Sequence, residues 1–385
     1  MLMRGGTSRA LFFHARDLPE DQQLRDRFIL AAYGSPDPDR RQVDGVGGAT
    51  SSTSKVATIS DGRHRGVDVL YHFGQVSIDQ SLIDRRGNCG NISSAVGPFA
   101  VDEGLVEATD PVTTVTFLNV NTNKQIVAHV PTRDGRFDPT GDFHLPGVPR
   151  TGAPIRLTYT DPAGSVTGKL LPTGRVVDEL AIPELGTVEA SLVDAANPLV
   201  FVRWEALGLT GTESPDEIDA DPALLARIEK VRAHAGVLAG IAETSEQVTS
   251  ETPSVPKLTF VGEPRDYTRT DGAVQRGKDT TLHAAMMSMG RLHRSYALTG
   301  GICTAVAVNI PGTVAAEVAG GSHTDCRVGH PSGVLPLRAD VEKGTRGWEV
   351  RSVAGYRTAR RLMEGAVLVP DEMLVRDGIS SGTGQ

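Results

Sequence analysis

The chain has 385 residues, of which 39% are hydrophobic and 22% charged, and its formal net charge is −8. This composition is typical of a globular protein with a substantial core and argues against a disordered chain. The negative charge argues against nucleic acid or an anionic membrane as a partner, and no apolar run approaches the roughly 20 residues of a membrane helix.

The N-terminal region does not resemble a signal peptide, because only the short apolar run 10–13 follows Arg4 and its neighbouring glycines. With three cysteines in the chain, these features predict a reduced cytoplasmic protein. The global charge does not exclude an anionic small-molecule substrate, because a local cluster of donors can outweigh it within a Debye length of about 8–10 Å.

Short apolar segments bounded by Gly, Pro, Asp or Asn predict many strands and few helices. In chain order, strands are expected at residues 11–13, 55–59, 67–71, 114–118, 125–130, 188–193, 199–202 and 258–261. Helices are expected at residues 20–33, 90–103, 222–235 and 301–310, and an acidic loop at 208–221.

A weak internal repeat relates the two halves. Residues 11–18 correspond to 199–207, Ser54–Ala57 corresponds to Pro256–Thr259, and each copy ends in a glycine-containing turn that opens an apolar helix. The repeat predicts an α+β fold with two similar domains, residues 1–180 and 181–385, each a barrel-like sheet around a central helix. This prediction leaves open whether the C-terminal segment returns to the first domain.

The strongest local signal is the run Gly87-Asn88-Cys89-Gly90-Asn91 before a predicted helix. Backbone N–H groups and the positive end of the helix dipole favour a thiolate at Cys89, and they can also bind a substrate carboxylate. A small buried cysteine at a tight turn explains the same residues equally well, so the pattern alone leaves both interpretations open.

A second signal is the loop from Gly45 to Lys55, which is rich in glycine and hydroxyl groups. Its backbone donors can hold an anion beside Lys55, and a desolvated lysine can act as a base. A solvated surface lysine is the commoner alternative. The loop is not a dinucleotide-binding fingerprint, because no apolar helix follows Gly45-Val46-Gly47 and no third glycine falls in place.

Three weaker signals also suit carboxylates. The run Arg4-Gly5-Gly6-Thr7-Ser8-Arg9 combines a flexible backbone with hydroxyl and guanidinium groups, although an ordinary N-terminal turn explains it as well. The run His330-Pro331-Ser332-Gly333 offers hydroxyl and backbone donors but lacks the first glycine of a nucleophile elbow. Lys278 is the weakest candidate, since a solvated loop cation explains it more simply.

The sequence predicts neither a metal site nor a bound cofactor. Its ten histidines are scattered, without the His-x-x-x-His or Cys-x-x-Cys spacing of zinc sites. No Walker phosphate-binding loop is present.

Taken together, these segments resemble the PrpF family, whose fold is similar to that of diaminopimelate epimerase. The matching stretches are residues 3–13, 34–37, 43–57, 88–97, 297–313 and 330–333, in the expected order. The family's catalytic lysine and cysteine match Lys55 and Cys89. One departure is Arg9, where members commonly carry lysine, with the charge kept.

Epimerases of this fold use one cysteine from each domain. Here the second-domain turn carries Leu298-Thr299-Gly300, and the nearest cysteine, Cys303, lies within the predicted helix. This difference favours allylic proton transfer by a lysine and a cysteine over stereoinversion by two cysteines.

The resemblance implies a cofactor-independent isomerase of unsaturated di- or tricarboxylic acids, such as 2-methylaconitate, 4-oxalomesaconate or aconitate. Lys55 removes an allylic proton in this hypothesis, and Cys89 either donates a proton or polarises the substrate. The expected substrate-binding residues are Arg4, Gly5, Thr7, Ser8, Gly47, Ser54, Asn88, Gly90, Asn91, Lys278, Thr299, Gly300, His330 and Ser332.

Two alternatives stay open at this point. One is a racemase or epimerase of the same fold, and the other is a non-catalytic carboxylate-binding protein. The expected partner is a small polycarboxylate. A homo-oligomer is left open, and so is the identity of the acid.

Overall fold

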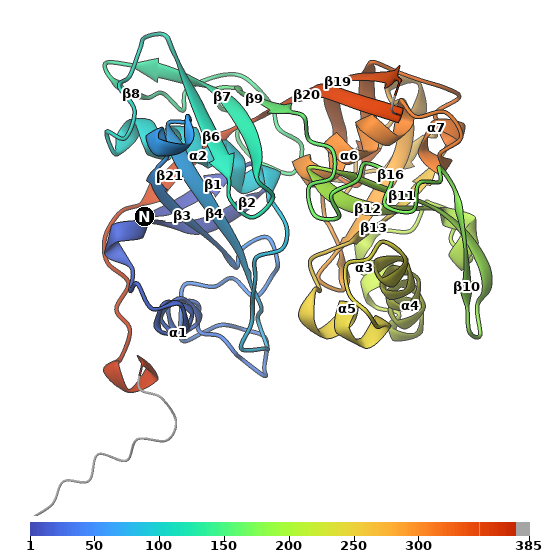
Figure 1. Ribbon diagram of the computed structural model, residues 1–385, viewed down its shortest axis with the longest axis horizontal. Helices are drawn as coiled ribbons and strands as arrows, with labels where there is room; N and C mark the ends of the chain where they lie inside the picture. The colour runs from blue at the N-terminus through green and yellow to red at the C-terminus, as the bar shows by residue number, and fades with distance from the viewer. Residues whose placement is uncertain (346, 375–385) are drawn as a thin grey trace, which may run out of the picture.

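The computed structural model describes residues 1–345 and 347–374, and its strands form two groups that lie side by side (Figure 1). The first group comes from the N-terminal part of the chain and contains two α-helices. Its elements are β1 (Leu2–Gly5), β2 (Ser8–His14), α1 (Gln22–Tyr33), β3 (Lys55–Asp61), β4 (Val69–Val76), β5 (Ile83–Asp84), α2 (Gly90–Asp102), β6 (Val112–Asn119), β7 (Lys124–Arg133), β8 (Arg136–Phe137) and β9 (Ile155–Thr160).

The second group begins with β10 (Asp178–Ile182), so the predicted division after residue 180 falls within a strand. Three α-helices lie between its third and fourth strands in chain order. Its further elements are β11 (Gly186–Ala195), β12 (Asn197–Arg203), α3 (Pro215–Asp219), α4 (Pro222–Leu238), α5 (Ser245–Glu251), β13 (Lys257–Gly262), β14 (Tyr267–Thr268), β15 (Val274–Gln275), β16 (Leu282–Ser288), β17 (Arg291–Leu292), α6 (Leu298–Val308), α7 (Val314–Val318), β18 (Asp325–His330) and β19 (Gly333–Gly344).

One helix lies at the centre of each group. Every residue of α6 is buried, and in α2 only the last residue, Asp102, is not. Both sequences are rich in Gly, Ala and Val, and a helix that is apolar or small on all sides is stable only where strands surround it. None of the helices among the described residues combines the length and apolar character needed to cross a bilayer.

The same order of strand pairings occurs in both groups. β2 pairs in parallel with β3, as β12 pairs in parallel with β13. The next strands follow the same order, with β3–β4 matching β13–β16 and β4–β6 matching β16–β18. Lys55 begins β3 and Lys257 begins β13, so the two lysines occupy equivalent positions.

The C-terminal strands connect the two groups. β20 (Gly347–Arg357) pairs with β19 of the second group and with β9 of the first. β21 (Ala359–Met363) then pairs antiparallel with β1, and Figure 1 shows these red segments running back to the N-terminal half. The chain therefore brings residues of its C-terminal segment against the start of α2.

Candidate active site

A narrow cavity lies where the two groups of strands meet, and both groups contribute residues to it. We call it the inner cavity. Its lining residues are Ser8, Lys55, Phe73, Gln75, Gly87, Asn88, Cys89, Asn91, Asn197, Ser254, Lys257, Ser288, His293, Ala297 and Thr299.

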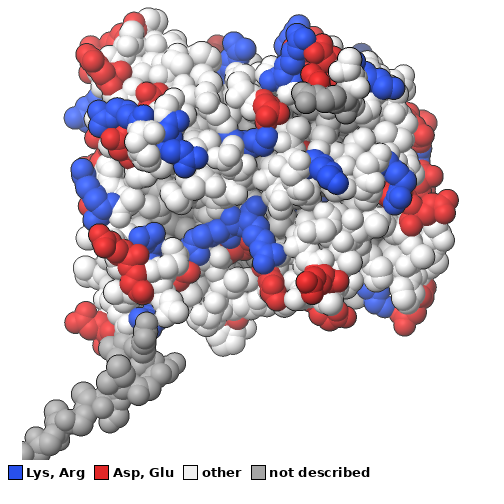
Figure 2. Space-filling model, in the orientation of Figure 1, with Lys and Arg blue, Asp and Glu red and all other residues white. Residues whose placement is uncertain are grey.

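Three of these residues, Gln75, Ser288 and His293, also line a wider cleft with a volume of about 1000 Å³, which we call the outer cleft. Four arginines and three acidic residues line the outer cleft. Three of the arginines, Arg40, Arg232 and Arg294, form ion pairs with acidic residues. Figure 2 shows basic side chains gathered near the middle of the face in view. The outer cleft therefore gives a small molecule a route toward the inner cavity.

Lys55 is held at the inner cavity by a fixed acceptor. Its side chain is 6% exposed, and its Nζ donates to Oε1 of Gln75. The Gln75 amide is itself oriented, because its Nε2 donates to the carbonyl oxygens of Ser51 at 3.1 Å and Ser54 at 2.9 Å. Desolvation lowers the pKa of Lys55, and the nearby Cys89 opposes that shift. The cavity thus holds an amine whose neutral form is more accessible than in water.

Cys89 is the N-cap residue of α2 and is 7% exposed. The following residue, Gly90, lies against the start of α6, because a Cβ atom there would approach the Thr299 amide nitrogen to 2.8 Å. The first N–H groups of a helix have no acceptor within the helix. The two helix starts therefore place two sets of amide donors beside the thiol, an arrangement that suits an anion.

The counterpart of Cys89 at the N-cap of α6 is Ala297, which also lines the inner cavity. The helix begins at Leu298, three residues before the predicted start, so Thr299 and Gly300 lie in its first turn. Gly300 lies within the helix and does not end it. It packs tightly there, since a Cβ atom would lie 2.7 Å from Sδ of Met286. The cavity therefore carries one thiol and, at the equivalent position, a methyl group.

Asn91 is fixed by residues far away in the sequence. Nε of Arg357 donates to its Oδ1 at 2.9 Å, and its Nδ2 donates to Oγ1 of Thr7 at 2.9 Å. Gly6 has a φ of +51° and leaves no room for a side chain, since a Cβ atom would lie 2.3 Å from Asn91 Oδ1. Desolvation lowers the pKa of Arg357 to about 10, so this buried guanidinium stays charged at neutral pH.

Asn197 is the clearest unsatisfied polar group of the cavity. It is 1% exposed, and within the described part of the chain neither polar atom of its side chain has a hydrogen-bond partner. It lies across from Gly87, where a Cβ atom would be 3.2 Å from its Oδ1. An unpaired buried polar group costs about 1–3 kcal/mol, so a bound carboxylate or hydroxyl group would satisfy this amide.

Lys257 adds a second amine to the inner cavity. Its Nζ donates to the Ser254 carbonyl oxygen at 2.9 Å. Desolvation, with a smaller effect from the charge of Lys55, lowers the pKa of Lys257 to about 8. Desolvation and both lysines likewise lower the pKa of His293 to about 3, so its ring is neutral at pH 7.

The PrpF protein family model matches residues 1–370. The chain belongs to the PrpF family. It is 44% identical to 3-methylitaconate isomerase from Eubacterium barkeri, covering 97% of this chain and 98% of that protein. It is 41% identical to 2-methyl-aconitate isomerase from Shewanella oneidensis, with 96% of each chain covered. The crystal structure of methylitaconate-delta-isomerase is similar, with a TM-score of 0.77 and 43% identity over 99% of this chain and 97% of that chain. This member of the PrpF family is an isomerase.

Several residues predicted from the sequence meet at the two connected spaces of this PrpF protein. Ser8, Asn88, Asn91 and Thr299 line the inner cavity with Lys55 and Cys89. Thr7 and Ser332 line the outer cleft. His330 lies elsewhere, on a separate cavity of about 320 Å³ that Thr7 also touches.

The remaining predicted binding residues have other contacts, and none of them lines the inner cavity. Nη1 of Arg4 donates to the carbonyl oxygens of Gly6 at 2.8 Å and Thr358 at 3.0 Å, which joins β1 to the C-terminal segment. Ser54 donates to Gln42 Oε1 at 2.7 Å. Gly5 packs against Asn91, Gly47 against Gln42 and Gly300 against Met286, while Lys278 is exposed in the short helix Gly277–Asp279.

Ten lining or supporting residues were not predicted as site residues: Phe73, Gln75, Gly87, Asn197, Ser254, Lys257, Ser288, His293, Ala297 and Arg357. The repeat contained a signal for one of them, because Lys257 was aligned with Lys55. Asn197 lies two residues before the second copy of the same repeat, but its role depends on an unsatisfied amide that only the packing reveals. Among the described residues, no group of three His, Cys, Asp or Glu side chains could hold a metal ion.

Proposed function

We propose that the chain isomerises an unsaturated di- or tricarboxylic acid by allylic 1,3-proton transfer, with Lys55 and Cys89 as its catalytic residues. One observation carries most of this proposal: a buried amine and a thiol line the same cavity, beside the starts of two helices. The names of the two relatives support this class of substrate, since itaconates and aconitates are unsaturated di- and tricarboxylic acids.

The reaction begins with the neutral amine of Lys55. It takes a proton from the allylic carbon, and the C–H electron pair forms a new double bond as the original π electrons move toward the conjugated carboxylate. The resulting dienolate carries its charge on carboxylate oxygens, which amide donors of the two helix starts can stabilise. General acid–base catalysis contributes about 10²–10⁴-fold, so these donors must supply much of the remaining rate enhancement.

A proton then returns to the other end of the allylic system, which shifts the double bond. Rotation about a bond of the dienolate before this step gives the cis–trans product instead. When the Cys89 thiol supplies the proton, the protein is left with a Lys55 ammonium and a Cys89 thiolate. Transfer of one proton between them restores the resting pair, so the reaction consumes no co-reactant.

Lys257 and Asn197 are suited to bind a carboxylate of the substrate. The Lys257 ammonium supplies charge, and the Asn197 Nδ2 group supplies a donor that has no partner within the described residues. An ammonium and an amide on one carboxylate fix its position relative to Lys55. The allylic carbon then lies within reach of the base in a defined orientation.

The proposal is tested by incubating the protein with 3-methylitaconate, and separately with 2-methylaconitate, in deuterated buffer. We expect the double bond of at least one acid to move or isomerise, with deuterium entering the product at an allylic carbon, as followed by proton NMR. Inversion of a chiral hydroxy or amino acid without movement of a double bond would favour a racemase. Binding of these acids without deuterium incorporation would favour a carboxylate-binding protein.

The pKa of Lys257 predicts how substrate capture depends on pH. The ammonium needed to bind a carboxylate is present below about pH 8 and is lost as the pH rises through that value. Loss of the Lys257 charge is therefore expected to lower kcat/KM above about pH 8, against the increase that comes from deprotonation of Lys55. The effect of Lys257 on kcat should be smaller, because a bound carboxylate keeps Lys257 protonated. The charged or titratable groups around Lys257 are Lys55, Cys89, Asp84, Arg232 and His293.

The matched variant is Lys257→Met. It should raise KM and remove the decrease in kcat/KM above pH 8, while deuterium exchange at saturating substrate persists. An alkaline limb that is the same in this variant and in the wild type would assign the titration to another group.

A further inference from the structure

The loop 252–256 between α5 and β13 presents Ser254 to the inner cavity, and Lys257, the first residue of β13, follows it directly. It contains no regular secondary structure to hold its backbone in place. Its carbonyl groups need hydrogen-bond donors from elsewhere, because a buried carbonyl group is rarely left unpaired. The backbone of Lys257 is held by pairing with β12, but its amine donates to the Ser254 carbonyl oxygen, so the position of the amine depends on this loop.

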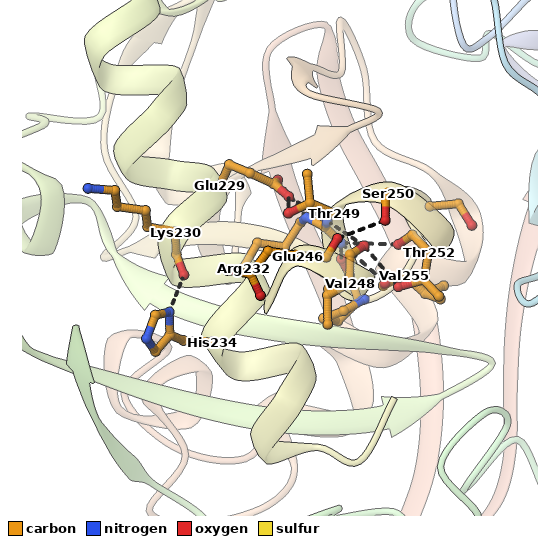
Figure 3. Close-up of polar contacts among 12 residues, drawn as sticks. Glu229, Lys230, Arg232, His234, Glu246, Val248, Thr249, Ser250, Thr252 and Val255 are labelled. Carbon is orange, nitrogen blue, oxygen red and sulfur yellow. Dashed lines mark hydrogen bonds and ion pairs between the residues drawn. The ribbon is translucent and has the colours of Figure 1, made fainter. Parts of the chain in front are cut away.

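One side chain on the neighbouring helix α4 supplies these partners. Arg232 is 5% exposed, and its guanidinium group points into the curve of the loop (Figure 3). Nη1 donates to the carbonyl oxygens of Thr252 at 3.2 Å, Val255 at 3.2 Å and Pro256 at 3.3 Å. Nη2 donates to the carbonyl oxygen of Val248 at 3.1 Å.

An acidic residue on the same helix holds the guanidinium group in this orientation. Glu229 accepts from Nε of Arg232 at 2.7 Å and from its Nη2 at 2.6 Å. Glu229 also accepts from the hydroxyl group of Thr249 at 2.6 Å, which joins α5 to the network. A bidentate pair of this kind fixes the plane of the guanidinium as well as its position.

The far side of the loop is anchored to the other half of the protein. The amide and hydroxyl groups of Ser254 donate to Oδ2 of Asp84 at 3.1 Å and 2.5 Å. The Ser254 carbonyl oxygen then accepts from Lys257 Nζ at 2.9 Å. A continuous chain of contacts therefore runs from Arg232 through the loop backbone to the Lys257 amine.

We propose that Arg232 is a positioning residue of the active site, which holds the 252–256 loop so that the Lys257 ammonium meets a carboxylate of the substrate. The inference rests on the proposed function, because it assigns Lys257 to substrate binding. Arg232 acts through the loop and does not itself touch the reacting atoms. Lysine cannot replace it, because a single ammonium cannot span carbonyl oxygens on opposite sides of a loop and also form a bidentate pair with Glu229.

The test is a double-mutant cycle between Arg232→Lys and Lys257→Met, measured by kcat and KM with the acid that the protein isomerises. We expect Arg232→Lys to raise KM about tenfold or more in the wild-type background, with a smaller change in kcat. In the Lys257→Met background the same substitution should change kcat/KM by about twofold or less, because the interaction it disturbs is already absent. Equal effects in both backgrounds would overturn the proposal.

A control on the same helix separates positioning from general damage. Lys230 lies two residues before Arg232 but points away from the loop in Figure 3. Its exposed amine pairs with Glu184, which lies outside this network. Lys230→Met should leave KM unchanged within twofold. Thermal unfolding of every variant shows whether it is folded, and Glu229→Gln provides a milder change to the same network if Arg232→Lys unfolds.

A second measurement needs no substrate. Competitive acetylation of the protein's lysines with acetic anhydride across a pH series, read by mass spectrometry, reports the titration of Lys257 directly. We expect Lys257 to titrate near pH 8 in the wild type and closer to an ordinary lysine in Arg232→Lys, because a loosened loop hydrates the amine. If no acid is isomerised but this shift appears, the proposed function fails and the positioning role stands. If the shift is absent, the positioning role fails whatever the activity.

Discussion

Replacing Lys55 by methionine is expected to lower kcat by about 10²–10⁴-fold, the usual contribution of a positioned acid–base group. Methionine keeps the length of the side chain but cannot accept a proton, so formation of the dienolate is blocked. Deuterium exchange into the substrate should fall by the same factor as isomerisation. KM should change much less, because the proposed carboxylate-binding residues are untouched.

Lys169→Met is a suitable control, since Lys169 is exposed and lies outside the inner cavity and the outer cleft. It should retain activity within twofold. A Lys55→Met variant with full activity would refute the proposed base. An unfolded variant is recognised by its far-UV circular dichroism and would be replaced by Lys55→Gln.

The second large effect is expected at Cys89. Cys89→Ser should lower isomerisation by about 10²-fold or more, because a hydroxyl group is a far weaker acid than a thiol. Deuterium exchange at the allylic carbon should survive better than isomerisation, because Lys55 can still remove a proton and return deuterium to the same carbon. That separation would identify Cys89 as the proton donor, whereas equal loss of both would identify it as a group that polarises the substrate.

The chain contains its own control for this substitution. Cys303 is fully buried in α6, away from the inner cavity, and its Sγ donates to the carbonyl oxygen of Val193 at 3.2 Å. Burial strongly raises the pKa of the Cys303 thiol, so it is not a nucleophile or acid near pH 7. Cys303→Ser preserves a hydrogen-bond donor and should leave kcat/KM unchanged within twofold. A similar loss in both serine variants would point to general damage.

The loss of the second thiol explains why double-bond movement fits this site better than stereoinversion. Inversion by two groups requires a proton donor and an acceptor on opposite faces of one carbon. The structure places Ala297 where a symmetrical site would carry a cysteine. Lys55 and Cys89 both come from the first copy of the repeat, which leaves Lys257 of the second copy available to bind charge.

Much of the fold was predictable because its signals are local. The strands that contain residues 55–59 and 199–202 are short apolar runs between turn residues, and α2 and α6 are apolar on all sides. Both patterns follow from neighbouring residues alone. The predicted start of α6 was wrong by three residues, because two adjacent glycines suggested a turn. In the folded protein they allow close packing against Met286 and Leu335.

The sequence by itself determined where α1, α2, α4, most of α6 and the named strands form, and it singled out Lys55 and Cys89 as candidate catalytic residues. It missed α5 and α7, and it was wrong to predict a loop throughout 208–221, because α3 forms there. It could not show that Asn197 has an unpaired amide, that Arg357 fixes Asn91 from 266 positions away, or that Arg232 supports the loop before Lys257. These facts depend on contacts between segments far apart in the chain. Such contacts leave no periodic or local pattern in the sequence, so only the tertiary structure decides which polar groups are paired and which face the cavity.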